Sequence, residues 1–369
     1  MELFDFYRNK KVLITGDTGF KGSWLAIWLN ELGANVFGYA LPYKSVRENY
    51  ATCKLNEVIS HEDGDIRDKD HMINYVSKVK PDIAFHLAAQ PLVIDSYKDP
   101  HYTFETNIMG SVNFFEAVRN TPSIKAAINI TSDKCYQNKE WIWSYREIEP
   151  MGGEDPYSAS KGAEELITNS YSKSFFYKEN TCSIASARAG NVIGGGDWAD
   201  NRIIPDYFRA LERKEKLNIR YPDAIRPWQH VLEPLNGYLI LGIKLFLQGK
   251  KFSGGWNFGP LDENSYSVRQ LIEALIEYTG TGEYVIQSGI EKLHEASLLK
   301  LDISKAINYL SWKPVLNFYE TVEFTVKGYR SELNDDNIYH SRVSQIKEFV
   351  ELQKRKESPP SKKYLPLFN

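Results

Sequence analysis

A tyrosine and a lysine stand four residues apart, at Tyr157 and Lys161, on a predicted helix from about Pro156 to Tyr177. Residues with this spacing lie on one face of a helix. A nearby ammonium group favours the phenolate and lowers the pKa of a tyrosine, so Tyr157 could act as a base at neutral pH. Taken alone, the pair is common by chance and fits an exposed helix surface just as well.

A second group of reactive side chains follows an apolar run from Ala126 to Thr131, where Ser132, Asp133 and Lys134 supply a hydroxyl, an acid and an amine. Ligands of open α/β folds bind at the carboxyl ends of the strands, so this position indicates a site. The alternative is a solvated turn capped by the aspartate. Cys135 is interpreted as a packing residue, because no partner histidine is indicated nearby.

The third feature is a glycine-rich stretch, Gly16-Asp17-Thr18-Gly19-Phe20-Lys21-Gly22, between a predicted strand (11–15) and a predicted helix (24–32). Glycines let the backbone turn sharply and approach a pyrophosphate, while the helix N-terminus points free N–H groups at the negative charge. The spacing is weak evidence, but its place between strand and helix favours a dinucleotide site. The alternative is a plain strand–helix turn.

The type of dinucleotide is left open. An acidic residue that would bind the adenosine ribose is expected near the end of the second strand, but residues 38–42 contain no carboxylate. Lys44 and Arg47 follow and could meet a 2′-phosphate, so NAD is expected and NADP is not excluded. Asp65 and Ile66 could flank the adenine, or Asp65 could be the N-cap of the next helix.

These groups need a scaffold that brings strand ends together. Predicted strands alternate with predicted helices, which indicates a parallel, doubly wound α/β sheet of the Rossmann type. The strands are 11–15, 34–41, 58–62, 82–88, 126–131 and 181–187, and the helices between them include 68–79 and 102–119. After Gly190 the pattern changes to a glycine loop (194–198) and mainly helical segments, such as 233–247 and 268–278. We therefore expect a dinucleotide-binding domain over 1–190 and a smaller, mainly helical substrate lobe over 191–369, with some segments returning to the first domain.

Composition excludes several classes of protein. The 369 residues carry 45 Lys+Arg and 48 Asp+Glu, a net charge of -3, which argues against nucleic acid or an anionic membrane as the main partner. A hydrophobic share of 42% is that of a globular protein. Three cysteines without a C-x-x-C pair argue against a disulfide framework or a metal site. Without an apolar leader or spanning segment, we expect a cytoplasmic protein; its last ten residues are expected to be mobile.

Taken together, the motifs resemble the extended short-chain dehydrogenase/reductases. This resemblance rests on the glycine loop, His86-Leu87-Ala88-Ala89-Gln90, Asn107, the Tyr-x-x-x-Lys pair and Arg188-Ala189-Gly190-Asn191. Longer motifs are similar to those of the sugar-nucleotide 4,6-dehydratases, in particular the branch that acts on CDP-glucose. They are residues 19–25, 86–93, 131–136, 150–153, 188–198 and 226–231. The likeness covers about residues 5 to 330.

The resemblance implies a role for each matching residue, with NAD as the cofactor and a sugar nucleotide as the substrate. The implied cofactor residues are Gly16, Thr18, Gly19, Phe20, Lys21, Gly22, Asp65, Ile66, Leu87, Ala88, Ala89, Asn107, Thr131, Tyr157 and Lys161. The implied substrate residues are Gln90, Ser132, Asn191, Trp198, Arg202 and Arg226, among which an arginine fork suits a pyrophosphate. The implied catalytic residues are Ser132, Asp133, Lys134, Tyr157 and Lys161.

The implied reaction converts CDP-glucose to CDP-4-keto-6-deoxyglucose and water. Tyr157 would take the 4-hydroxyl proton while the C4 hydride moves to NAD+, and the resulting ketone would acidify the C5 hydrogen. Lys134 would remove that proton and Asp133 would protonate the leaving 6-hydroxyl, after which the hydride returns to C6 and a proton returns to C5. The cofactor ends oxidised, so the net reaction is that of a lyase. The resemblance also implies deoxysugar biosynthesis, such as that of O-antigen lipopolysaccharide.

One residue separates branches of the family. Related dTDP-glucose dehydratases have Asp-Glu where this sequence has Asp133-Lys134, so the lysine favours the CDP-glucose branch. A lysine must be neutral to act as a base, and burial or nearby positive charge would have to lower its pKa. The alternative is that Lys134 only orients the substrate or Asp133.

Two other functions are alternatives. A sugar-nucleotide 4-epimerase needs the same Tyr157 and Lys161 but not the Asp-Lys pair. A cofactor-binding regulator would be expected to lose Tyr157 or Lys161, and both are present. Homologous enzymes commonly dimerise through a helix pair, for which residues 102–119 and 156–177 are the candidates. A homodimer or a dimer of dimers is therefore expected.

Overall fold

The structure is a computed structural model that describes residues 3–179, 181–261, 265–286, 298–334 and 337–357. Its centre is a sheet of seven parallel strands: β1 (Lys11–Thr15), β2 (Asn35–Ala40), β3 (Ser60–Asp63), β4 (Ile83–His86), β5 (Ala126–Ile130), β6 (Ser183–Arg188) and β11 (Gly254–Asn257). Their order is β11-β6-β5-β4-β1-β2-β3. The order reverses direction at β1, so the carboxyl ends of β1 and β4 form the crevice where such sheets bind ligands. The predicted Rossmann-type fold is confirmed.

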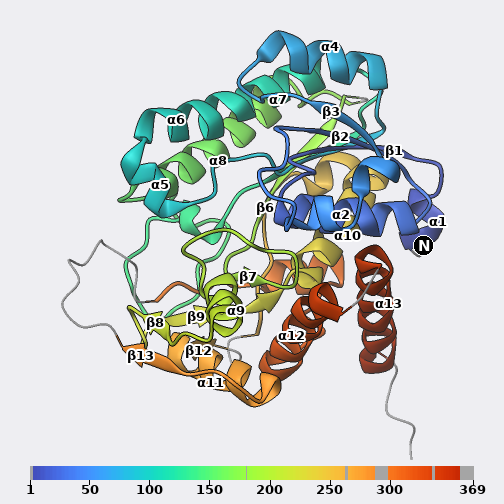
Figure 1. Cartoon of the computed structure of the whole chain (residues 1–369). Coiled ribbons are helices and arrows are strands. Elements are labelled where there is room, and N and C mark those ends of the chain that lie inside the picture. The colour runs from blue at the N-terminus through green and yellow to red at the C-terminus, as the bar shows by residue number, and fades with distance from the viewer. Residues whose placement is uncertain (1–2, 180, 262–264, 287–297, 335–336, 358–369) are drawn as a thin grey trace, which may run out of the picture.

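Helices cover both faces of this sheet (Figure 1). In the first half of the chain they are α1 (Leu3–Tyr7), α2 (Phe20–Glu31), α3 (Asn49–Thr52), α4 (Lys69–Val79), α5 (Val93–Lys98), α6 (Pro100–Phe104), α7 (Gly110–Arg119) and α8 (Pro156–Ser174). Strand side chains alternate between two cores, as the pleat requires. Val12 and Ile14 enter the core with α2, whereas Leu13 enters the core with α4 and α7.

The second half of the chain forms a smaller lobe and also returns to the sheet. Its helices are α9 (Ile203–Arg213), α10 (Leu232–Gln248), α11 (Val268–Thr279), α12 (Phe318–Asn334) and α13 (Ile338–Glu357). Short strands pair as β7 (Val192–Ile193) with β10 (Gln229–His230), β8 (Leu217–Ile219) with β13 (Tyr284–Ile286), and β9 (Ile225–Pro227) with β12 (Ser265–Ser267). The lobe has its own core around Tyr207, Leu271 and Val322. In contrast, β11 pairs with β6, α10 packs on β5 and β6, and α13 packs on α2.

Several elements differ from the sequence prediction. Helix α2 begins at Phe20 rather than Trp24, because the last loop glycine lies inside the helix. The predicted helix 102–119 is interrupted by a π-helical turn (Glu105–Met109), which places Asn107 against Gln90 and Ser160. Strand β11 and helix α13 were not predicted. The loop at 194–198 is confirmed. Ser267 and Gln270 form a capping box at the start of α11. The last ten residues, expected to be mobile, lie outside the described residues.

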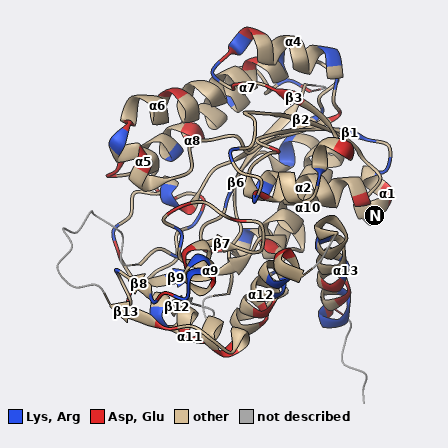
Figure 2. Ribbon diagram, in the orientation of Figure 1, with Lys and Arg blue, Asp and Glu red and all other residues tan. Residues whose placement is uncertain are grey.

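Charged residues of both signs are interspersed along outer helices such as α4 and α12 (Figure 2). Across the described ranges, no helix has both the length and the apolar character needed to cross a membrane. In the same ranges, no group of three or more His, Cys, Asp or Glu side chains could hold a metal ion. The three cysteines are buried free thiols, and burial raises the pKa of Cys135 well above its ordinary value.

Candidate active site

The glycine loop connects β1 to α2, and its backbone packs closely against neighbouring backbone atoms. Gly16 has a φ of +77°, and a Cβ there would lie 2.6 Å from the backbone nitrogen of Ala88. A Cβ at Gly22 would lie 2.0 Å from the carbonyl oxygen of Gly16. Gly19 is the N-cap of α2, and no side chain caps its N–H groups. This close backbone cradle at an uncapped helix N-terminus fits a dinucleotide pyrophosphate.

A cavity of about 1050 Å³ runs along the carboxyl edge of the sheet and begins at this loop. Most of the predicted cofactor residues line it: Gly16, Thr18, Gly19, Phe20, Lys21, Gly22, Asp65, Ile66, Leu87, Ala88, Ala89, Thr131, Tyr157 and Lys161. Three predicted substrate residues, Gln90, Trp198 and Arg202, line it as well. The structure therefore brings residues from both halves of the chain to one cavity.

Asp65 and Ile66, which follow β3, line the same cavity. The alternative that Asp65 caps α4 is wrong, because Asp68 accepts the hydrogen bond from the His71 backbone N–H at 3.0 Å. Asp65 instead pairs with Arg67 at 2.6 Å. That ion pair leaves Asp65 at the cavity wall, where an adenine could contact it.

Lys44 and Arg47 also line the cavity beyond the end of β2. The Arg47 guanidinium is held by both carboxylate oxygens of Glu212, at 2.6 and 3.0 Å, and lies 3.5 Å above the Trp198 ring. Arg47 is therefore already engaged by a carboxylate, which weakens its case as a ligand for a 2′-phosphate.

Tyr157 and Lys161 lie on the buried face of α8, whose start is fixed by Pro156 at the first turn and by the Asp155 side chain as its cap. Burial raises the pKa of Tyr157, whereas Lys161 and a hydrogen bond with Ser132 act to lower it. The net direction is upward, so the predicted net lowering of the Tyr157 pKa is wrong for the ligand-free site. The lysine acts in the predicted direction, but desolvation outweighs it.

The Lys161 ammonium has a carboxylate partner that was not predicted. Glu164 lies one helical turn further on, 2.8 Å from the Lys161 Nζ, and both side chains are almost completely buried. Burial lowers the pKa of Lys161, but Glu164 and Tyr157 more than offset this and raise it. Burial raises the pKa of Glu164 to about 7, against the opposing effect of Lys161. Glu164 follows Lys161 by three residues, and this helical spacing could have predicted the ion pair from the sequence.

The second predicted cluster forms a single 3₁₀ turn, η3 (Asp133–Cys135), after β5. Ser132 caps this turn by accepting the Lys134 backbone N–H at 3.2 Å, and its hydroxyl donates to the Asp133 carboxylate at 2.9 Å. Asp133 is buried against Gly190, where a Cβ would lie 1.9 Å from Asp133 Oδ2. The alternative of a solvated turn is therefore wrong for Asp133.

Lys134 is less enclosed than its neighbours, since its side chain is only partly buried. No group in the described part of the chain forms a hydrogen bond or ion pair with its ammonium. The complete burial that would favour a neutral lysine is therefore not present in the protein alone.

A buried ion pair supports the strand ends beneath these residues. Glu165 on α8 pairs with Arg188 at the end of β6 at 2.6 Å, and it also accepts hydrogen bonds from Thr131 and Ser186. Burial alone would raise the pKa of Glu165, but Arg188 and the two hydroxyls bring it below its ordinary value. The network ties α8 to β5 and β6 and so fixes Tyr157 relative to the η3 turn. Sequence reasoning did not identify Glu165.

Six predicted site residues are not among those that line the cavity: Asn107, Ser132, Asp133, Lys134, Asn191 and Arg226. Residues 132–134 directly follow Thr131, which does line it. Asn107 is buried, and its side-chain amide is bonded to the Gln90 backbone and to Ser160, so it acts on the cavity through Gln90. The Gln90 amide in turn bonds to Leu92 and Thr103. Asn191 directly precedes β7, and Arg226 lies on β9, the strand before β10.

A parallel sheet with a glycine loop at β1 and a Tyr-Lys pair at its carboxyl edge defines the short-chain dehydrogenase/reductase class, in its extended form with a second lobe. Within that class, residues 13–325 match the family described as GDP-mannose 4,6 dehydratase, and the chain belongs to this family.

Individual relatives give a finer comparison. The chain is 46% identical over 350 residues to the CDP-glucose 4,6-dehydratase of Salmonella typhimurium, covering 94% of this chain and 98% of that protein. It is 26% identical over 338 residues to the CDP-paratose 2-epimerase of Salmonella typhi, covering 85% and 97%.

Solved structures show the same fold. The UDP-glucose 4-epimerase of Thermotoga maritima with UDP-glucose aligns with a TM-score of 0.76 at 23% identity, over 88% of this chain and 100% of that chain. The UDP-glucose 4-epimerase of Thermus thermophilus in complex with NAD aligns with a TM-score of 0.75 at 22% identity, over 87% and 99%.

Proposed function

We propose that the protein converts CDP-glucose to CDP-4-keto-6-deoxyglucose and water, with NAD as a cofactor that is regenerated in each turnover. One observation carries the proposal: helix α8, which carries Tyr157, packs on the η3 turn, which carries Asp133 and Lys134, and the Ser132 hydroxyl at the start of that turn donates to Asp133 at 2.9 Å. Oxidation at C4 and elimination across C5–C6 need two sets of proton-transfer groups around one sugar. The identity of 46% to a CDP-glucose 4,6-dehydratase supports the same reaction.

In this proposal Tyr157 takes the proton of the sugar 4-hydroxyl. The buried Lys161 stabilises the phenolate, and Glu164 keeps Lys161 protonated and in place. Ser132 holds the 4-hydroxyl oxygen near Tyr157. NAD, bound along the glycine loop, would supply the redox chemistry by accepting a hydride from C4 and returning it to C6.

Asp133 and Lys134 act on the other side of the sugar. Asp133 protonates the leaving 6-hydroxyl, and its carboxylate is held for this by the Ser132 hydroxyl and by the contact with Gly190. Lys134 removes the C5 proton, and a proton returns to C5 when the hydride returns to C6. Because its side chain is partly exposed in the protein alone, the bound sugar has to complete the desolvation that would make it a base.

The remaining assignments follow the cavity. Arg202, which Asp197 holds at 2.8 Å, would bind the nucleotide diphosphate together with Trp198. Asn191 and Arg226 would bind the nucleotide from the smaller lobe.

We also propose a cytoplasmic homodimer, or a dimer of dimers, that pairs α6, α7 and α8, whose surfaces expose Phe104 and Leu166. We propose a role in deoxysugar biosynthesis, such as that of O-antigen, because the product would be a deoxysugar nucleotide.

The test is a panel of CDP-, dTDP-, GDP- and UDP-sugars with NAD, analysed by mass. Release of one water from CDP-glucose, and not from the others, supports the proposal. Dehydration of another nucleotide sugar alone would overturn the substrate, and isomerisation of a sugar without loss of mass would favour a 4-epimerase instead.

A further inference from the structure

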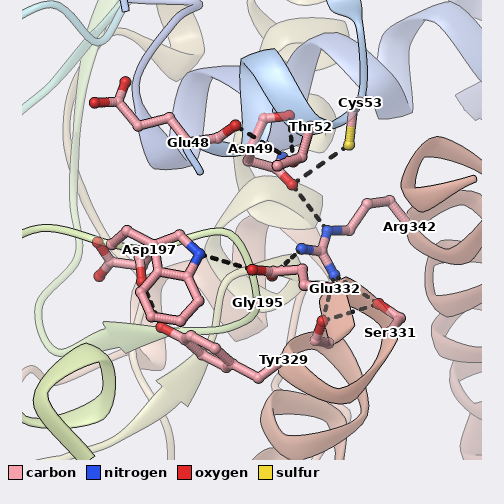
Figure 3. A network of polar contacts seen from close by, with 12 residues as sticks. Glu48, Asn49, Thr52, Cys53, Gly195, Asp197, Tyr329, Ser331, Glu332 and Arg342 are labelled. Atoms are coloured by element: carbon pink, nitrogen blue, oxygen red, sulfur yellow. Dashed lines mark hydrogen bonds and ion pairs between the residues drawn. The ribbon is translucent and has the colours of Figure 1, made fainter. Parts of the chain in front are cut away.

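Arg342 on α13 is completely buried, although it lies outside the cavity and outside every motif of the sequence. Its guanidinium donates to Asn49 Oδ1 at 2.8 Å, to the Gly328 carbonyl at 2.9 Å and to the Glu332 carboxylate. Figure 3 shows this guanidinium between the α3 residue Asn49 and the α12 residue Glu332. Three separate segments of the chain are thus fixed by one planar group.

Glu332 links Arg342 to Trp198, a residue of the cavity wall. One of its carboxylate oxygens binds Arg342, and the other accepts the indole N–H of Trp198 at 2.7 Å. The Trp198 ring in turn lies 3.5 Å below the Arg47 guanidinium, which forms two hydrogen bonds with Glu212. These five side chains form a continuous series of contacts, which we name the Arg342 relay.

The loop that carries Trp198 has little freedom to move away from Arg342. A Cβ at Gly195 would lie 2.6 Å from the Gly328 carbonyl carbon and 2.7 Å from Arg342 Nη1. Gly196 has a φ of +83°, and a Cβ there would lie 2.5 Å from Asn49. The Trp24 indole N–H also binds the Gly195 carbonyl at 2.9 Å. Arg342 is therefore part of the surface that sets the position of Trp198.

The outer end of the relay closes one side of the cavity. Arg47 and Trp198 both line the cavity. The Arg47 and Glu212 side chains are 41% and 34% exposed, whereas that of Arg342 is 0% exposed. The stack therefore joins residues 42–48, which follow β2, to residues 196–202 of the smaller lobe on the solvent side of the cavity. Residues of both loops line the same cavity as the glycine loop.

We propose that Arg342 is a positioning residue that, through Glu332, holds the Trp198–Arg47 stack across the cavity and slows the departure of the bound dinucleotide. This inference rests on the proposed function, in which the cofactor ends each turnover in the form in which it began. Such an enzyme does not need to exchange NAD between turnovers. Slow dissociation of NAD is therefore compatible with a high rate of turnover.

The test measures the rate at which NAD dissociates from the full-length protein, by displacement with an excess of a competing dinucleotide in a stopped-flow instrument. Trp198→Phe removes the indole N–H but keeps a ring beneath Arg47 and leaves the Arg342–Glu332 pair intact. Glu332→Gln removes the charge that binds both neighbours. Each variant should release NAD about tenfold faster, as expected for loss of a hydrogen bond to a charged group. The double variant should be no faster than Glu332→Gln, because both changes break the same contact.

The matched control is Lys327→Gln, which breaks the α12–α13 ion pair between Lys327 and Glu348 on the surface without touching the relay. It should release NAD at the wild-type rate. Unchanged dissociation in Trp198→Phe and Glu332→Gln, or lowered thermal stability as their only effect, would overturn the inference. A wild-type protein that binds no NAD would instead overturn the proposed function and this inference with it.

Discussion

Replacing Gly190 by alanine should displace the Asp133 carboxylate and so impair its function, although Asp133 itself is unchanged. A Cβ at this position would lie 1.9 Å from Asp133 Oδ2 and 2.1 Å from its Cγ. Ordinary van der Waals contact begins at 3.4 Å, so the carboxylate has to move by about 1.5 Å, the difference between these two separations. Asp133 cannot retreat freely, because the Ser132 hydroxyl binds its other oxygen at 2.9 Å.

A displacement of this size should slow the reaction by about 10²-fold or more, since a misplacement of about 1 Å at a reacting group has a cost of that order. The loss should fall on elimination and not on oxidation, because Tyr157 lies on α8 and is not displaced. In deuterated water the variant should exchange the C5 hydrogen of CDP-glucose faster than it releases dehydrated product. Asp133→Asn should show the same separation of the two rates.

Gly259→Ala is the matched control, because its Cβ would meet only Leu301 and Ile303, at 3.6 Å or more. Both variants should be compared by thermal unfolding, since crowding at Gly190 is also expected to destabilise the fold by about 1–3 kcal/mol. A folded Gly190→Ala protein that dehydrates CDP-glucose as fast as Gly259→Ala would refute the role given to the Asp133 position.

Three further changes test other parts of the site. Tyr157→Phe should slow the whole reaction by about 10²-fold or more, measured as product formation, and near-normal turnover would mean that another group takes the 4-hydroxyl proton. Burial, with help from neighbouring cations, lowers the pKa of Lys21 to about 8; NAD affinity measured by calorimetry should therefore be highest below pH 8 and fall as the pH rises through it, and Lys21→Met should abolish this step. Glu165→Gln should reduce the free energy of unfolding by about 3–5 kcal/mol in denaturant titrations, because it leaves Arg188 buried without its partner. Since the pKa of Glu165 is depressed, the wild-type contribution is present at neutral pH and lost as the pH falls through that value, and the variant should lack this acid sensitivity.

Local patterns were sufficient for the parts of the site that lie within one strand–loop–helix unit. The glycine loop was predictable because its spacing, strand and helix are contiguous in the sequence. The Tyr157–Lys161 pair was predictable from helical spacing, and the position of Asp133 from the end of an apolar strand. These inferences depend on contacts between residues that are near in sequence, where the geometry of helices and strands fixes the neighbours.

The parts that sequence reasoning missed depend on contacts between distant residues. Glu165 reads as an ordinary helical glutamate until β6 brings Arg188 against it. Arg342 is 293 positions from its partner Asn49, so no local pattern indicates the contact. The direction of the Tyr157 pKa was wrong because the lysine is visible in the sequence, whereas the depth of burial depends on the whole fold. Arg47 was considered as a phosphate ligand because its partner Glu212 belongs to another lobe.

The central claim is that oxidation and elimination occur on one sugar in one cavity. The most direct test is to incubate the wild-type protein and NAD with CDP-glucose that carries deuterium at C4, and to locate the label in the product by NMR. The account predicts a product that is lighter by one water and carries the deuterium at C6. Dehydrated product without deuterium at C6, or label that remains at C4 of an undehydrated sugar, would contradict it.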